Sequence, residues 1–396
     1  MILHPIECEQ HGNAVRVQCR VEHSGTEEVL WYEVDEKYAP YLTTDRHDGF
    51  LVGILLLAMK LGEDIEVRGA LSEKLCYNVA TYYTRILELI MPSLRSVRIG
   101  ADRLLGLRDT LRAPGVATGF SAGIDSFCSV YDHLFAEVPS TFRVTHFVFN
   151  NVGSHGEWDG ERARKLFLRR YDLIKGFPGE LGVSFVKIDS NLSEILGMDF
   201  ERTHTPRNIS AVLMLQGLFG RYYYSSAFRY EDCRIGGGKG IGYADPCAVH
   251  LLSTEVFDCI STGSQHTRVE KTRRTALVPG SERWLNVCVT PGADGRNCSK
   301  CWKCCRTLLT LELLGALEQF APSFDLTTWW NVRDRYITRT VLRDVDDALS
   351  AEIREFAAEI GYSFPARHWL LSYALRIATP PVRAAKKMMG AGKQRG

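Results

Sequence analysis

The stretch GVATGFSAGIDSFCSV, residues 115–130, begins as an apolar strand, turns through small residues and continues as a helix. Such a turn directs backbone N–H groups and the side-chain oxygens of Ser121, Asp125 and Ser126 at one point above the strand end. The helix that follows presents the positive end of its dipole there. This geometry suits an anion such as a phosphate, so the rest of the chain must distinguish a nucleotide site from an ordinary strand-to-helix corner.

Length, composition and charge indicate an ordinary globular protein. The chain has 396 residues, 45% hydrophobic and 24% charged, and a net charge of +1 that favours neither nucleic acid nor membranes. The longest apolar run, FLVGILLLAM, stops at Lys60 and is too short to span a bilayer. The N-terminus lacks the pattern of a signal peptide. We therefore expect a cytoplasmic protein with no membrane partner.

Hydrophobic periodicity divides the chain into three expected domains. Residues 1–110 alternate as antiparallel strands and then turn helical, which predicts an N-terminal α+β domain. In residues 111–315, strand candidates such as RVTHFVFN alternate with helical stretches such as ISAVLMLQGLFGRYY, which is typical of a parallel sheet covered on both faces. Residues 316–396 are mostly amphipathic helix with a basic tail. The expected fold class is α/β, with a parallel-sheet domain between an α+β domain and a helical extension.

The six residues SAGIDS resemble the phosphate loop SGGxDS of the PP-loop ATP pyrophosphatases, and the ending of a Walker loop is missing. The resemblance implies an adenine-nucleotide α-hydrolase fold that uses ATP and Mg²⁺. It also implies that ATP is cleaved between its α and β phosphates while a substrate oxygen becomes adenylated. By the same resemblance, Ser121, Gly123 and Ser126 hold the phosphates, and Asp125 helps to hold the magnesium.

Further residues complete the expected ATP site. Ala122 replaces the second glycine of the pattern, and a positive φ there would cost on the order of 1 kcal/mol. The helix beginning at Ile124 and the strand-end residue Asn150 are assigned to ATP binding. Lys271, with Arg268 in the same TRVEKTRR stretch, is a candidate for neutralising the departing pyrophosphate. The alternative interpretation of that stretch is a solvated helix start.

Three more stretches, NNVGSHGEWDGERARK, THTPRNISAVLML and IGYADP, resemble in the same order parts of the 7-cyano-7-deazaguanine synthases. This resemblance implies a small, planar, purine-like substrate beside His155, Arg207, Asn208 and Asp245. Lys239, in GGGKGIG, is a further candidate for binding the substrate. Each of these residues also has a plainer interpretation. His155 is compatible with a turn histidine and Arg207 with an exposed cation. Asn208 is compatible with a helix cap, and the stretch around Lys239 with a mobile glycine loop.

Four cysteines are spaced C-x9-C-x2-C-x2-C, close enough for their thiolates to surround Zn²⁺ tetrahedrally at about 2.3 Å. A structural zinc on a similar cluster is also implied by the synthase resemblance. The predicted ligands are Cys288, Cys298, Cys301 and Cys304.

The sequence does not decide whether nitrogen or sulfur is the incoming nucleophile. The synthase resemblance implies ammonia, with no protein nucleophile. Sulfur would need a sulfur donor protein and a cysteine persulfide, for which Cys128, Cys233 and Cys247 are candidates. A third hypothesis keeps the nucleotide fold only as a scaffold for protein recognition. Residues 1–110 hold no basic stripe, which disfavours nucleic acid, and a homodimer is compatible with the sequence.

Overall fold

The chain groups into two compact units, Met1–His266 and Thr267–Gly396. This division differs from the expected boundaries at residues 110 and 315, because strands from both sides of residue 110 join one sheet. The computed structural model describes residues 1–107, 111–155, 160–236, 240–290, 295–343 and 347–378.

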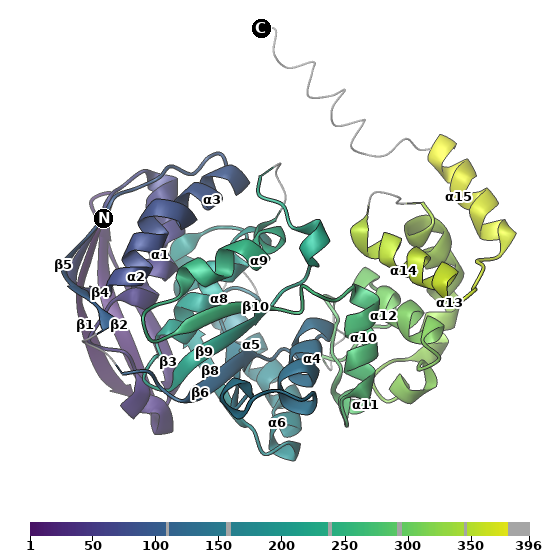
Figure 1. Cartoon of the computed structure of the whole chain (residues 1–396), viewed down its shortest axis with the longest axis horizontal. Coiled ribbons are helices and arrows are strands. Elements are labelled where there is room, and N and C mark those ends of the chain that lie inside the picture. The colour runs from purple at the N-terminus through teal and green to yellow at the C-terminus, as the bar shows by residue number, and fades with distance from the viewer. Residues whose placement is uncertain (108–110, 156–159, 237–239, 291–294, 344–346, 379–396) are drawn as a thin grey trace, which may run out of the picture. The chain divides into compact units, whose positions relative to one another are not determined.

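A single sheet forms the centre of the first unit (Figure 1), in the order β10-β9-β6-β7-β8-β3-β2-β1-β4-β5. Pairing is parallel from β10 to β8 and from β1 to β5, and antiparallel between β8, β3, β2 and β1. The expected α/β class with a mostly parallel sheet is therefore confirmed. The strands in the described residues are β1 (Ile2–His11), β2 (Ala14–His23), β3 (Thr26–Asp35), β4 (Ile65–Ser72), β5 (Ile99–Leu105), β6 (Gly115–Gly119), β7 (His146–Asn150), β8 (Ser184–Ser190), β9 (Phe219–Ser225) and β10 (Asp258–Thr262).

Strand β3 joins the N-terminal part of the chain to the parallel part. It pairs with β2 through a tight turn in which Ser24 and Gly25 both have positive φ, as this kind of hairpin requires. Its other edge pairs with β8, where Tyr32 lies opposite Ser190. The predicted antiparallel strands are confirmed, but they extend the parallel sheet.

Helices cover both faces of the parallel part of this sheet from β6 to β10, as predicted, whereas β2 and β4 alternate buried and exposed residues. Alternate residues of β7 show the two layers, because Phe147 stacks toward Phe177 of α6 whereas Val148 joins the core that includes α1 and α8. Helix α4 packs on β6 and β9, and α1 packs on α8. The helices of this unit in the described residues are α1 (Asp48–Leu61), α2 (Glu73–Asn78), α3 (Thr84–Ile90), α4 (Ile124–Val130), α5 (Gly160–Ile174), α6 (Gly176–Glu180), α7 (Leu192–Leu196), α8 (His204–Leu213) and α9 (Asp245–Ala248).

The predicted helix through ISAVLMLQGLFGRYY is wrong in its second half. Helix α8 ends at Leu213, and FGRYYYS forms β9 beside β6. Aromatic residues favour strands, and the backbone between the two elements passes too close to Tyr41 for any side chain at Gly217, whose Cβ would lie 2.8 Å from the Tyr41 carbonyl oxygen. The misassigned segment is thus a central strand of the parallel part of the sheet.

The second unit is helical in its described residues, with Trp329 fully buried in its core. The predicted amphipathic helix VDDALSAEIREFAAEI is confirmed as α14. The helices are α10 (Arg268–Leu277), α11 (Ser281–Trp284), α12 (Trp302–Leu313), α13 (Leu326–Tyr336), α14 (Ala348–Glu359) and α15 (Ala366–Ala378).

Candidate functional site

The carboxyl end of β6 is a topological switch point. The chain leaves β6 and continues through β7 and β8 on one side, whereas β9 and β10 lie on the other side. Loops that leave neighbouring parallel strands in opposite directions open a crevice, which is where α/β proteins bind ligands. The SAGIDS turn lies at this point, between β6 and α4.

The backbone of the SAGIDS turn is left-handed at one residue. Ala122 has φ 57° and is fully buried, so the chain keeps a conformation that costs a non-glycine residue about 1 kcal/mol. The Phe120 N–H donates to the Val148 carbonyl oxygen at 2.9 Å, and Ser126 Oγ donates to the Gly123 carbonyl oxygen at 2.9 Å. Strained residues of this kind persist where the surroundings hold them, often at ligand sites.

Asn150, at the end of β7, carries a buried acceptor oxygen that the described residues leave without a hydrogen bond. Its Nδ2 lies 3.3 Å from Asn208 Oδ1 and 3.4 Å from the Asn208 carbonyl oxygen. Its own Oδ1 is buried without a hydrogen bond among the described residues. A buried amide oxygen left unsatisfied costs about 1–3 kcal/mol, so this atom is suited to accept a hydrogen bond from a ligand. The structure thus brings Asn150, assigned to ATP binding, within hydrogen-bond distance of Asn208, assigned to the substrate.

His155 and Arg207 hold the loop that follows β7. His155 Nε2 lies 3.2 Å from the Asn150 carbonyl oxygen, and burial lowers the pKa of His155 to about 3, so the ring is neutral. Arg207 is 1% exposed and donates to the Val152 carbonyl oxygen at 3.2 Å and to Ser193 Oγ at 3.1 Å. The alternative interpretation of Arg207 as an exposed cation is therefore wrong, because its side chain ties the loop after β7 to the segment after β8.

Asp245, the first residue of α9, is 1% exposed and accepts a hydrogen bond from Thr205 Oγ1 at 2.7 Å. Burial raises the pKa of this carboxyl to about 7, and the hydrogen bond from Thr205 opposes the rise only in part. The group can therefore be protonated near neutral pH and donate as well as accept.

The three candidate sulfur carriers fall into two places. Cys233 and Cys247 meet with their sulfurs 3.7 Å apart, and burial raises the pKa of the Cys247 thiol to about 11. Cys128 lies on α4 and is fully buried. Sequence separation alone did not indicate that Cys233 and Cys247 form a pair.

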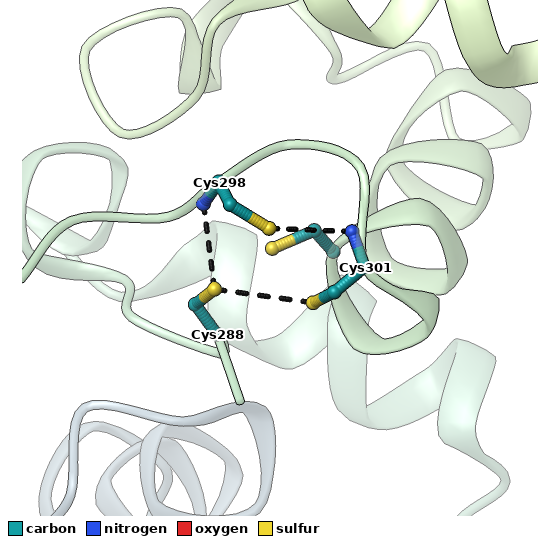
Figure 2. Close-up of side chains that lie close together, drawn as sticks. Cys288, Cys298 and Cys301 are labelled. Carbon is teal, nitrogen blue, oxygen red and sulfur yellow. Dashed lines mark hydrogen bonds between the residues drawn. The ribbon is translucent and has the colours of Figure 1, made fainter. Parts of the chain in front are cut away.

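The four predicted zinc ligands converge in the second unit. Figure 2 shows Cys288, Cys298 and Cys301 facing one another, with the sulfurs of Cys288 and Cys301 3.9 Å apart. Together with Cys304, their sulfurs lie within 4.8 Å of one another. Zn–S bonds of about 2.3 Å in a tetrahedron separate the sulfurs by about 3.8 Å, so the observed cluster fits zinc.

The local backbone also favours thiolates at this cluster. The Cys298 N–H donates to Cys288 Sγ at 3.4 Å, and the Cys301 N–H donates to Cys298 Sγ at 3.3 Å. Ser299 has φ 57°, which bends the C-x2-C turn so that these N–H groups face sulfur. The hydrogen bond from the Cys304 thiol lowers the pKa of Cys301 to about 3. The same hydrogen bond raises the pKa of Cys304, so the thiolate form is favoured at Cys301 in particular.

The structure does not place two predicted cations relative to the SAGIDS turn. Lys239 lies outside the described residues. Lys271 lies on α10 in the second unit together with Arg268, and both are buried, so the alternative interpretation of a solvated helix start is wrong. Helix α10 instead begins with a capping box between Thr267 and Glu270.

The sequence patterns did not identify two residues that lie near Cys128 of α4. Asp132 and His266 approach Cys128, and His266 Nε2 lies 3.0 Å from Asp132 Oδ2. Because Cys128 and Asp132 are four residues apart in a predicted helix, the sequence could have indicated that these two side chains are neighbours. His266 is far away along the chain, so only folding identifies it.

Neither a protein-family model, a curated protein nor a solved structure matches this chain. Among the described residues, no helix is both long and apolar enough to cross a bilayer.

Proposed function

We propose that the first unit binds ATP at the carboxyl end of β6 and adenylates a carbonyl or carboxylate oxygen of a small purine-like substrate. Pyrophosphate leaves first, and AMP leaves when nitrogen from ammonia replaces the activated oxygen. The observation that carries the proposal is the SAGIDS turn at the switch point, with Ala122 held at φ 57°. A cytoplasmic location and ATP pyrophosphatase membership belong to the same proposal.

The roles of the chain's own residues are positional and electrostatic. Ser121, Gly123 and Ser126 would hold the phosphates, and the N-terminal end of α4 would favour their negative charge. The Asp125 carboxylate would help to hold Mg²⁺, which usually takes one or two carboxylates besides phosphate oxygens. Bound Mg²⁺ would neutralise charge on the phosphates. The Oδ1 of Asn150, which has no hydrogen-bond partner in the described part of the chain, would accept a hydrogen bond from the nucleotide or the substrate.

The products of ATP turnover test this proposal. The full chain is incubated with labelled ATP, Mg²⁺ and candidate heterocyclic acids, and the label is followed into AMP, ADP, pyrophosphate and phosphate. We expect AMP and pyrophosphate, and a loss of about 100-fold or more in the Asp125→Asn variant. The matched control is Asp172→Asn, because Asp172 on α5 is 63% exposed and pairs only with Lys175 among the described residues.

Other outcomes would contradict this reaction. Formation of ADP and phosphate would refute cleavage between the α and β phosphates. ATP binding without any turnover would favour the alternative in which the nucleotide fold serves protein recognition.

Sulfur insertion is a second candidate because Cys233 and Cys247 lie 3.7 Å apart. The terminal sulfur of a persulfide on one cysteine would attack the adenylated carbon and displace AMP. The second thiolate would then break the S–S bond, releasing the thiocarbonyl product and leaving a disulfide that a thiol must reduce. Product mass separates the candidates, since sulfur for oxygen raises the mass and an amide for an acid lowers it. Full activity of the Cys233→Ala variant would exclude the sulfur route through this pair.

A further inference from the structure

Three side chains of the first unit that have no part in the proposed ATP chemistry meet beside α4: Cys128, Asp132 and His266. We propose that they form a second metal site, which takes Zn²⁺ with a water molecule in the fourth position. The site is separate from the four-cysteine cluster, and its existence does not depend on the proposed function.

The distances between the three ligand atoms suit one tetrahedral ion. Cys128 Sγ lies 3.7 Å from Asp132 Oδ2, His266 Nε2 lies 3.0 Å from the same oxygen, and all three atoms lie within 4.8 Å of one another. Zinc bonds of about 2.3 Å to sulfur and about 2.0 Å to nitrogen or oxygen separate the ligand atoms by about 3.3–3.5 Å. Small rotations of the side chains therefore place all three on one ion.

The helix is shaped to bring two of these ligands to one side. Cys128 and Asp132 are four residues apart, which places them on the same helix face. The α-helical part ends at Val130, and residues Tyr131–Phe135 continue as a π-helical turn. Such turns are rare and occur frequently at functional sites. The adjacent His133 is engaged elsewhere, with Nε2 2.8 Å from Thr262 Oγ1, so it is not counted as a ligand.

Burial and ligand chemistry point to the same ion. Cys128 is fully buried, His266 is 8% exposed, and the Asp132 side chain is 11% exposed. Charges buried in this way are normally paired or bound to metal. One sulfur, one nitrogen and one oxygen form a mixed set of donors, which suits zinc better than magnesium or calcium. Three protein ligands leave one position for water, as in zinc sites that keep an open position.

The metal content of the full chain tests the site. The chain is purified without chelators, equilibrated with Zn²⁺, desalted, and analysed for all first-row transition metals. We expect two equivalents of zinc in the unmodified chain and one in the Cys128→Ser and His266→Ala variants. Cys259→Ala is the matched control, because Cys259 is also a buried cysteine of the first unit but lies outside both clusters. It should keep two equivalents.

Cobalt substitution gives an independent measurement on the same proteins. The band from thiolate-to-Co²⁺ charge transfer should be weaker in the Cys128→Ser variant, while the contribution of the four-cysteine cluster remains. Circular dichroism establishes that the variants are folded, and His266→Gln replaces any variant that is not. One equivalent of metal in the unmodified chain, or two equivalents that survive both the Cys128 and the His266 substitution, would overturn the proposal and leave the three residues as a hydrogen-bonded group.

Discussion

Replacing Asp245 by Asn should remove a large part of the pH dependence of stability. Burial raises the pKa of this carboxyl from 3.8 to about 7 in the folded chain, whereas the unfolded chain ionises it normally. Its contribution to stability is therefore fully present below about pH 4 and is lost as the pH rises to about 7. A shift of about three pKa units at about 1.4 kcal/mol per unit corresponds to about 4 kcal/mol.

Asparagine has nearly the same shape as the protonated carboxyl but does not ionise. The Asp245→Asn variant should match the unmodified chain near pH 4 and exceed its free energy of unfolding by up to about 4 kcal/mol at pH 8. Three ionisable groups interact electrostatically with this carboxyl: Tyr83, Tyr224 and Cys247. Burial raises the pKa of each, so they stay neutral between pH 4 and pH 8.

Urea unfolding, followed by circular dichroism and tryptophan fluorescence at several pH values, measures this difference. Asp172→Asn is the control for an exposed carboxylate and should change stability by less than about 0.5 kcal/mol at every pH. Parallel pH profiles for the unmodified chain and Asp245→Asn would refute the argument, because they would mean that Asp245 ionises equally easily in the folded and unfolded states.

Two further predictions concern the zinc cluster and the helix packing. Cys298→Ser should remove one equivalent of zinc and make the second unit susceptible to limited proteolysis, since zinc contributes folding energy at such sites. Cys305→Ala is the control and should keep the metal, because Cys305 lies outside the cluster. Gly49→Ala should destabilise the first unit by about 1–3 kcal/mol in urea unfolding, because its Cβ would lie 2.6 Å from the Ser210 carbonyl oxygen of α8. Gly100→Ala is its control, with no atom within 4 Å of the added Cβ, and an equal loss of stability there would contradict the packing argument.

Local sequence was informative wherever neighbouring residues carry the structure. The alternating N-terminal strands, the SAGIDS turn and the C-x2-C-x2-C run all depend on residues that are close along the chain. The helix predicted across residues 209–223 failed because its apolar pattern fits a buried helix and a central strand equally well. Only the pairing of β9 with β6 distinguishes the two alternatives.

The sequence by itself determined the α/β class, the small-residue turn with its hydroxyls and carboxylate, and the four cysteines at zinc spacing, because period, turn chemistry and ligand spacing are short-range properties. The tertiary structure decided that β3 and β8 join the N-terminal strands to the parallel sheet. It also decided that Arg207 is buried, that Cys233 meets Cys247, and that His266 reaches Asp132. These features depend on burial and on contacts between distant segments, which arise only when the chain packs around one sheet.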